Sequence, residues 1–167
     1  KPLTWLSLSA LLAVQAAGLG IQSTQTIKPD FRAAAAYYEQ SRQAGDRLLF
    51  LIPQAAVVFE QLLPADSTPY LAAPYTNAGL DAARLDWEMR ALLGESRRVW
   101  LLESEPELWD AGGLIPAWLE RHGRRALRIP YHLVTLSLYD DLRVAERPPH
   151  GLSWPLVIQR NPRLTSP

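Results

Sequence analysis

The sequence of 167 residues contains no cysteine. Disulfides, iron–sulfur clusters and thiolate zinc sites are therefore excluded. It also lacks an excess of either charge, because 17 lysines and arginines balance 17 aspartates and glutamates. A domain that binds nucleic acid needs a basic surface that attracts phosphates, so we expect no nucleic-acid partner.

Glycine is missing where a nucleotide site would need it. Dinucleotide and phosphate sites place glycines directly after a strand, so that the backbone can approach the phosphate. The strongest apolar run, residues 45–53, is instead followed by Gln54-Ala55-Ala56. The pair Gly112-Gly113 is better explained as a loop before a helix. We therefore expect no cofactor in this domain.

Other catalytic and metal-binding patterns are missing as well. The sequence has no Gly-x-Ser-x-Gly nucleophile elbow. Its three histidines, His122, His132 and His150, fall on a predicted helix end, a strand turn and the tail. A metal site needs clustered ligands, and this spacing favours separate surface positions. We predict no metal ligand and no catalytic residue in the chain.

The stretch 45–53 is the feature around which the chain is organised. Its apolar residues Leu48–Ile52 follow the turn pair Gly45-Asp46 and are closed by Pro53. A short continuous apolar run between such residues is typical of a strand buried on both faces. Because helical patterns lie before and after it, we predict that this stretch is the central strand of an α/β sheet.

Apolar spacing and capping residues predict the other elements. Asp30 is expected to cap the start of the first helix of this domain, and Gly45 to end it. The predicted helices are 30–44, 54–63 (ended by Pro64), 80–93 (capped by Gly94) and 113–121, whose apolar face is Leu114, Ile115, Trp118 and Leu119. The predicted strands are 45–53, 70–73, 97–104, 124–130 and 133–139.

The last two strands are joined too closely for a helix, so they should form an antiparallel hairpin. Residues 132–138 alternate between apolar and polar types, which predicts a half-exposed edge strand. We predict an α/β fold with a three-layer Rossmann-like sheet, mainly parallel, with an antiparallel C-terminal edge hairpin. This domain covers residues 28–142, and the proline-rich residues 143–167 form an extended tail.

Residues 1–27 carry no charge between Lys1 and Lys28, and residues 3–21 are mostly apolar. This apolar helical segment has three interpretations. It approaches the roughly 20 apolar residues of a transmembrane helix and fits the end of one. Its small residues after an apolar centre also fit a signal peptide. The third interpretation is a buried amphipathic helix. The first two place the following domain at or beyond a membrane.

A group of acidic residues follows the strand 97–104, namely Glu103, Glu105, Glu107 and Asp110. Ligands of open α/β sheets bind outside the carboxyl ends of the strands. A pair of carboxylates there can perform acid–base chemistry, and the competing interpretation is a solvated acidic loop. The candidate ligand-binding residues are Gln54, Asn77, Glu103, Ser104, Glu105, Trp109 and Asp110.

Five short segments share their order and spacing with one protein family. They are Asp30–Ala34 at a helix start, Ala44–Phe50, Arg98–Leu102, Trp118-Leu119 and Leu138-Tyr139. Through them, residues 5–140 resemble the C-terminal soluble region of bacterial membrane glycosyltransferases of the protein-mannosyltransferase type (glycosyltransferase family 39 and its relatives). Phe31 stands where the family usually has tryptophan.

The resemblance implies a specific function. Such enzymes are polytopic membrane proteins that transfer a sugar from a polyprenyl-phosphate donor to an acceptor on the outer face. Their catalytic carboxylate lies in an early loop outside this chain. The resemblance thus implies an extracytoplasmic domain at the cell membrane, non-catalytic by itself, that assists acceptor binding. The implied partners are the membrane portion of the same polypeptide, the polyprenyl-phosphate sugar donor and a glycan or protein acceptor.

Two other interpretations stay open. One is a membrane-tethered α/β binding or interaction module without transferase activity. The other is a small soluble enzyme that uses the acidic group Glu103–Asp110. The residues beyond Tyr139 also depart from the family, whose chains often stop near that position.

Overall fold

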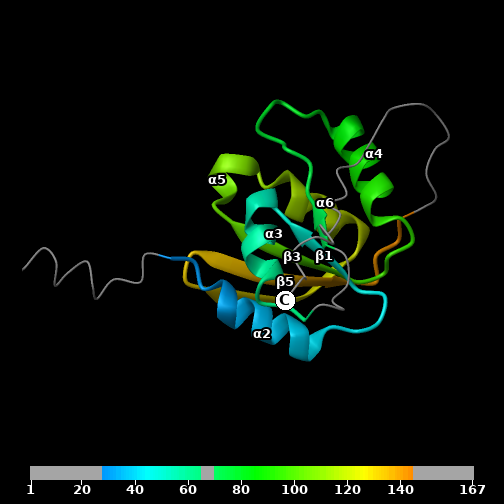
Figure 1. The fold of residues 1–167 in the computed structure, drawn as a ribbon. Coiled ribbons are helices and arrows are strands. Elements are labelled where there is room, and N and C mark those ends of the chain that lie inside the picture. The colour runs from blue at the N-terminus through cyan, green and yellow to red at the C-terminus, as the bar shows by residue number, and fades with distance from the viewer. Residues whose placement is uncertain (1–27, 65–69, 145–167) are drawn as a thin grey trace, which may run out of the picture.

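Five strands form one open sheet in the order β2-β1-β3-β5-β4. Figure 1 labels β1, β3 and β5 of this sheet, with the helices packed around it. The structure is a computed structural model that describes residues 28–64 and 70–144. The strands are β1 (Arg47–Phe50), β2 (Tyr70–Ala72), β3 (Val99–Ser104), β4 (Arg124–Tyr131) and β5 (Val134–Asp140). The helices are α2 (Phe31–Ser41), α3 (Pro53–Glu60), α4 (Ala82–Leu93), α5 (Pro106–Trp109) and α6 (Leu114–His122). The predicted α/β class is confirmed.

The pairing of the strands confirms the C-terminal hairpin and corrects the centre of the sheet. β1 pairs in parallel with β2 and β3, whereas β5 is antiparallel to both β3 and β4. The prediction that residues 45–53 contain the central strand is wrong, because β3 occupies the middle position. A strand needs only one neighbour on each side to be an interior strand of the sheet. An apolar run therefore identifies a strand in the interior of the sheet but does not tell whether that strand is the middle one.

The prediction that residues 133–139 form an edge strand is also wrong. β5 lies between β3 and β4, and β4 is the edge. The alternation arises from Thr135 and Ser137, but Ser137 is fully buried and its hydroxyl donates to Glu103 Oε2 at 3.4 Å. Ser137 therefore faces a polar part of the sheet rather than solvent, and Thr135 is half-buried. β4 is mostly exposed and carries arginines and a proline, which discourage pairing with another chain.

Successive residues of the strands divide the core into two clusters on opposite faces of the sheet. Leu48 and Phe50 belong to a cluster that α2 and α3 cover. Leu49 and Leu51 belong to the second cluster, which α4 and α6 cover. Helices from both halves of the described chain thus bury the apolar side chains of one sheet, which is the main stabilising contribution to such a fold.

The first helix confirms its predicted start and corrects its predicted end. The Asp30 carboxylate accepts a hydrogen bond from the backbone amide of Ala33 at 3.0 Å, as an N-cap does. The helix ends at Ser41 rather than at Gly45, because Arg42 already has extended backbone. Gly45 instead supplies a positive φ of 88° in the turn before β1, a conformation that glycine adopts without strain.

Two of the other helices end next to the glycine that was predicted to stop them, and α3 ends earlier than predicted. α3 ends at Glu60, short of the predicted Leu63, because a turn separates the helix from Pro64. Proline disfavours helical backbone in the residue before it, so the helix has to stop earlier. α4 ends at the predicted cap Gly94, and α6 is followed directly by Gly123.

Asp46 forms a buried polar contact at the amino end of the parallel strands. Its carboxylate accepts hydrogen bonds from Trp100 Nε1 at 2.8 Å, Arg98 Nε at 2.9 Å and the Gln43 amide at 3.0 Å. The Trp100 ring packs edge-on against Tyr38 of α2, with 5.7 Å between the centroids. This contact, called the Asp46 network below, joins the turn before β1, the start of β3 and α2.

Some predictions concern residues that the structure does not describe. The apolar segment 1–27 lies outside the described residues, as does the tail from residue 145 onward. None of the helices within 28–64 and 70–144 combines the length and the hydropathy that crossing a bilayer requires.

Candidate functional site

The seven candidate residues lie near the carboxyl end of the parallel strands, but in different settings. Asp110 is the most buried of the acidic group, at 2% exposure. Its carboxylate accepts hydrogen bonds from the backbone amides of Leu114 and Ile115, each at 2.9 Å, and from the Thr76 hydroxyl. Both oxygens are occupied, so Asp110 caps the start of α6 and stabilises the fold.

Asn77 and Trp109 tie two loops together. The Asn77 side-chain amide donates to the Glu107 carbonyl at 2.9 Å and accepts from the Ala111 amide at 2.8 Å. Trp109 Nε1 donates to the Ala73 carbonyl at 3.3 Å. These bonds hold the loop after β2 against the segment after β3. The two candidate residues therefore shape the end of the sheet.

Gln54 and Ser104 lie apart from the polar groups described next. Gln54 is exposed in the first turn of α3, directly after β1. Ser104 is buried at the end of β3, where it pairs with Val134 of β5. Successive residues of a strand face opposite sides of the sheet, so Ser104 and Glu103 point in opposite directions.

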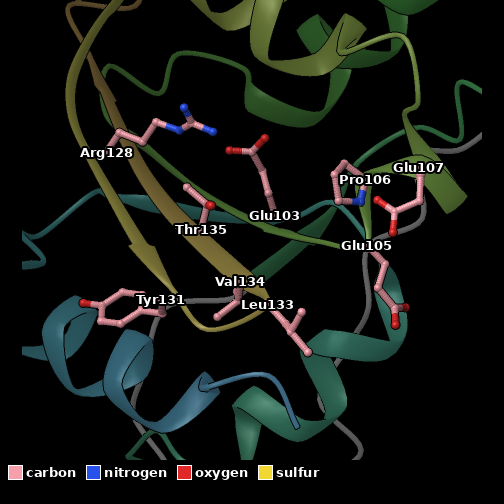
Figure 2. A pocket seen from close by; sticks show the side chains of 9 residues that line it. All are labelled: Glu103, Glu105, Pro106, Glu107, Arg128, Tyr131, Leu133, Val134 and Thr135. Atoms are coloured by element: carbon pink, nitrogen blue, oxygen red, sulfur yellow. The ribbon is translucent and has the colours of Figure 1, made fainter. Parts of the chain in front are cut away.

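A groove of about 390 Å³ opens beside the end of β3. Figure 2 shows the Glu103 carboxylate and the Arg128 guanidinium pointing toward one another across it. Two acidic residues of the group, Glu105 and Glu107, are exposed at its border. The remaining lining residues are Pro106, Tyr131, Leu133, Val134 and Thr135. This groove, called the Glu103 groove below, unites three of the predicted acidic residues with a cation that the prediction did not include.

The electrostatics of the groove are dominated by the half-buried Glu103. Burial raises the pKa of its carboxyl above the usual value, and the Arg128 guanidinium and the Ser137 hydrogen bond oppose this shift. Burial raises the pKa of the neighbouring Tyr139 to about 12, with a further contribution from the negative charge of Glu103. A desolvated carboxylate beside a guanidinium and hydroxyl groups is suited to hydrogen-bond a polar ligand.

The sequence did not indicate Arg128, Tyr131 and Thr135, because they lie on the hairpin. The register of β5 places Thr135 opposite Glu103, and that of β4 places Arg128 opposite Ser137. The available signal was the polar alternation along 132–138. It predicts a polar sheet face correctly but does not tell whether that face meets solvent or a groove.

The histidines in the described ranges have unrelated contacts. The His122 ring stacks on Trp118 with 4.0 Å between centroids, and its Nε2 lies 3.5 Å from Asp86 Oδ1. His132 lies in the hairpin turn, where its carbonyl accepts from the Asp30 amide at 3.0 Å. Within residues 28–64 and 70–144, no three histidine or carboxylate side chains are grouped as metal ligands would be. His150 lies outside the described residues.

Comparison of the chain with protein-family models, with curated proteins and with solved structures found no match.

Proposed function

We propose that this chain is the extracytoplasmic C-terminal domain of a polytopic membrane glycosyltransferase that uses a polyprenyl-phosphate sugar donor. In this proposal the domain has a three-layer Rossmann-like arrangement and no catalytic residue of its own. The Glu103 groove binds hydroxyl groups of a glycan or protein acceptor and presents them to the membrane portion of the same polypeptide. The domain then lies on the extracytoplasmic face of the cell membrane.

The Asp46 network is the observation that carries the proposal. Asp46, Arg98 and Trp100 come from two of the segments on which the family resemblance depends, and they are bonded to each other. The helix that Asp30 starts packs on the same network through Tyr38. If the matching segments reflect a shared fold, residues from different segments should contact each other in the structure. Asp46 contacts both Arg98 and Trp100, as this expectation requires. The network therefore supports the resemblance as one of fold.

The groove supports the part assigned to acceptor binding. Small-ligand sites combine a concave surface with a few convergent polar groups, and groups with perturbed pKa values gather there. Glu103, Arg128 and Thr135 offer an acceptor, a donor and a hydroxyl within one groove. Asp110 has both oxygens occupied by hydrogen bonds within the fold, so a binding role for the group suits the geometry better than paired acid–base catalysis.

The first test is the coding sequence upstream of Lys1. The proposal expects many apolar spans and an early acidic residue in a loop. A start codon immediately before Lys1 would overturn it.

The second test uses the full-length protein in membranes. The variant Glu103→Gln combined with Arg128→Ala should raise the KM for the acceptor while leaving kcat nearly unchanged, because the groove binds but does not react. Glu95→Gln is the matched control, since Glu95 is exposed in the loop before β3, at the opposite end of the sheet. An equal KM in both variants would remove the groove from acceptor binding.

A second candidate function is a membrane-tethered binding module without transferase activity. The observation that favours it is the same groove, which offers groups that can bind a ligand. The Asp110 carboxylate is occupied by hydrogen bonds within the fold, so it cannot pair with Glu103 for acid–base catalysis. An upstream sequence with a single apolar span would favour this candidate over the first.

A further inference from the structure

Four large apolar side chains are exposed at the carboxyl end of the sheet. They are Tyr75 (45% exposed), Leu108 (61%), Leu114 (38%) and Leu133 (56%). Leu114 was predicted to lie on the buried face of its helix, but it is the first residue of α6 and points outward. The other large apolar residues exposed in the described part of the chain, Val57, Val58 and Leu62, lie along or just after α3.

These four residues come from separate segments that the fold brings to one end. Tyr75 follows β2, and its ring lies 4.8 Å from that of Trp109 in α5, next to Leu108. Leu133 is at the turn of the hairpin, where Val134 pairs with Ser104 at the end of β3. Residues 105–107, which directly precede Leu108 in the chain, line the Glu103 groove together with Leu133. The apolar end of the domain is defined as Tyr75, Leu108, Leu114 and Leu133, and of these Leu133 lines the Glu103 groove directly.

The described chain begins at this same end. The amide of Asp30 donates to the carbonyl of His132 in the hairpin turn at 3.0 Å. The uncharged apolar residues 3–21 precede it, and residues 22–27 provide the connection. From residue 21 to Asp30 the chain has nine residue steps, which reach at most about 30 Å. If residues 3–21 enter a bilayer, the hairpin turn has to stay close to the surface of that bilayer.

The charges at this end select among lipid surfaces. The exposed residues beside Leu108 include Glu105 and Glu107, and the opposite charge in the groove is Arg128. Lys28 and Arg32 are exposed next to the contact between Asp30 and the hairpin turn, so this end carries charges of both signs and lacks the excess of basic residues that anionic headgroups attract. Exposed leucines and a tyrosine favour the boundary between headgroups and acyl chains, where an aromatic ring keeps its hydroxyl in water.

We infer that the apolar end of the domain rests on a zwitterionic lipid bilayer surface, with Leu108 and Leu133 entering the headgroup–acyl boundary. This inference shares the membrane location of the proposed function but is independent of transferase activity. It also orients the molecule, since the loop before β3 then points away from the bilayer. The mouth of the Glu103 groove lies close to the lipid surface, where a lipid-linked or membrane-bound molecule would meet it.

The absence of cysteine makes a direct test possible. Leu108→Cys, Leu133→Cys and the control Glu95→Cys are each made in the 167-residue chain and labelled with an environment-sensitive fluorophore. Circular dichroism confirms that each labelled protein is folded. Each is then mixed with phosphatidylcholine vesicles, with and without quenchers attached to the acyl chains. The expected result is a shift to shorter wavelength and strong quenching at 108 and 133, with neither at 95.

Three outcomes would overturn the inference. In the first, all three labels stay aqueous, whether or not the chain binds vesicles. In the second, all three labels are quenched equally, which shows contact without a defined orientation. In the third, the labels at 108 and 133 change with protein concentration in the absence of vesicles, which identifies a second copy of the chain as the occupant. A failed transferase assay would change none of these readings, so the two proposals fail separately.

Discussion

Replacement of the buried Asp46 by alanine should cost the domain a large part of its stability. Asp46 is 1% exposed, and its carboxylate is bonded to Trp100 Nε1 and to the Arg98 guanidinium. The substitution Asp46→Ala leaves the indole donor of Trp100 buried without its partner. It also leaves Arg98 without its counter-charge, although that side chain is 26% exposed and can turn toward water.

The magnitude follows from these two losses. A buried donor without a partner costs about 1–3 kcal/mol. Removal of one member of a buried ion pair costs about 3–5 kcal/mol, and the exposure of Arg98 places this pair at the lower end of that range. The two penalties overlap, so we expect a total loss of about 3–4 kcal/mol from a stability of about 5–15 kcal/mol. For a domain of this size the Tm should fall by about 12–16 °C.

Urea unfolding and thermal melting of the 167-residue chain measure this loss. The matched control is Asp81→Ala, because Asp81 is an exposed N-cap whose carboxylate accepts from the Arg84 amide at 2.8 Å. An N-cap of this kind contributes about 1 kcal/mol. The variant Trp100→Phe removes the indole donor, so Asp46→Ala should cost less in that background. Equal losses for Asp46→Ala and Asp81→Ala would show that the buried contacts of Asp46 contribute no more than an exposed helix cap.

Three further variants test the groove, the chain packing and an ion pair. Glu103→Gln should raise the Tm at pH 7, because the pKa of Glu103 is raised in the folded protein and folding therefore disfavours the charged carboxylate. The gain in Tm should disappear when the pH falls below the usual pKa of 4.5, where the carboxyl is protonated in both the folded and the unfolded protein. The exposed control Glu105→Gln should show no such gain. Gly123→Ala should lower the Tm, since a Cβ there would lie 2.7 Å from the backbone oxygen of Asp140, whereas Gly112→Ala meets only a leucine side chain at 3.6 Å and should be tolerated. The hydrogen bond from Arg90 lowers the pKa of Asp86, so Asp86→Asn should lower the Tm at neutral pH. The Tm values of the variant and the parent protein should converge as the pH falls below 3.8, where the carboxylate of the parent becomes protonated. A difference in Tm that stays constant with pH would contradict a stabilising ion pair between Asp86 and Arg90.

Much of the local structure is predictable because its causes are local. Asp30 caps α2 through its own side chain, and Gly94 ends α4 by accepting a conformation that other residues avoid, both as predicted. Asp81 caps α4 in the same local way but was not predicted. The turn before β1 and the apolar run that forms β1 also have local causes. The close spacing of the last two strands was enough to predict an antiparallel hairpin.

The order of the strands was not predictable in the same way. β1 and β3 are both short apolar runs, and each is buried on both faces. Which of them is central depends on where the C-terminal hairpin adds, and β5 adds to β3 rather than forming the edge. A period-2 pattern reports that the two faces of a strand differ. It does not report which of them meets water.

The sequence alone was enough to predict an α/β domain without thiol chemistry, with a helix start at Asp30 and a hairpin at its C-terminal end. The tertiary structure alone decided which residues of the acidic group share a site. Asp110 turns inward to cap α6, whereas Glu103 faces the groove with Arg128, which follows it by 25 positions in the chain (128 − 103). Side-chain neighbours across a sheet are set by pairing and register, and those depend on the packing of the whole domain.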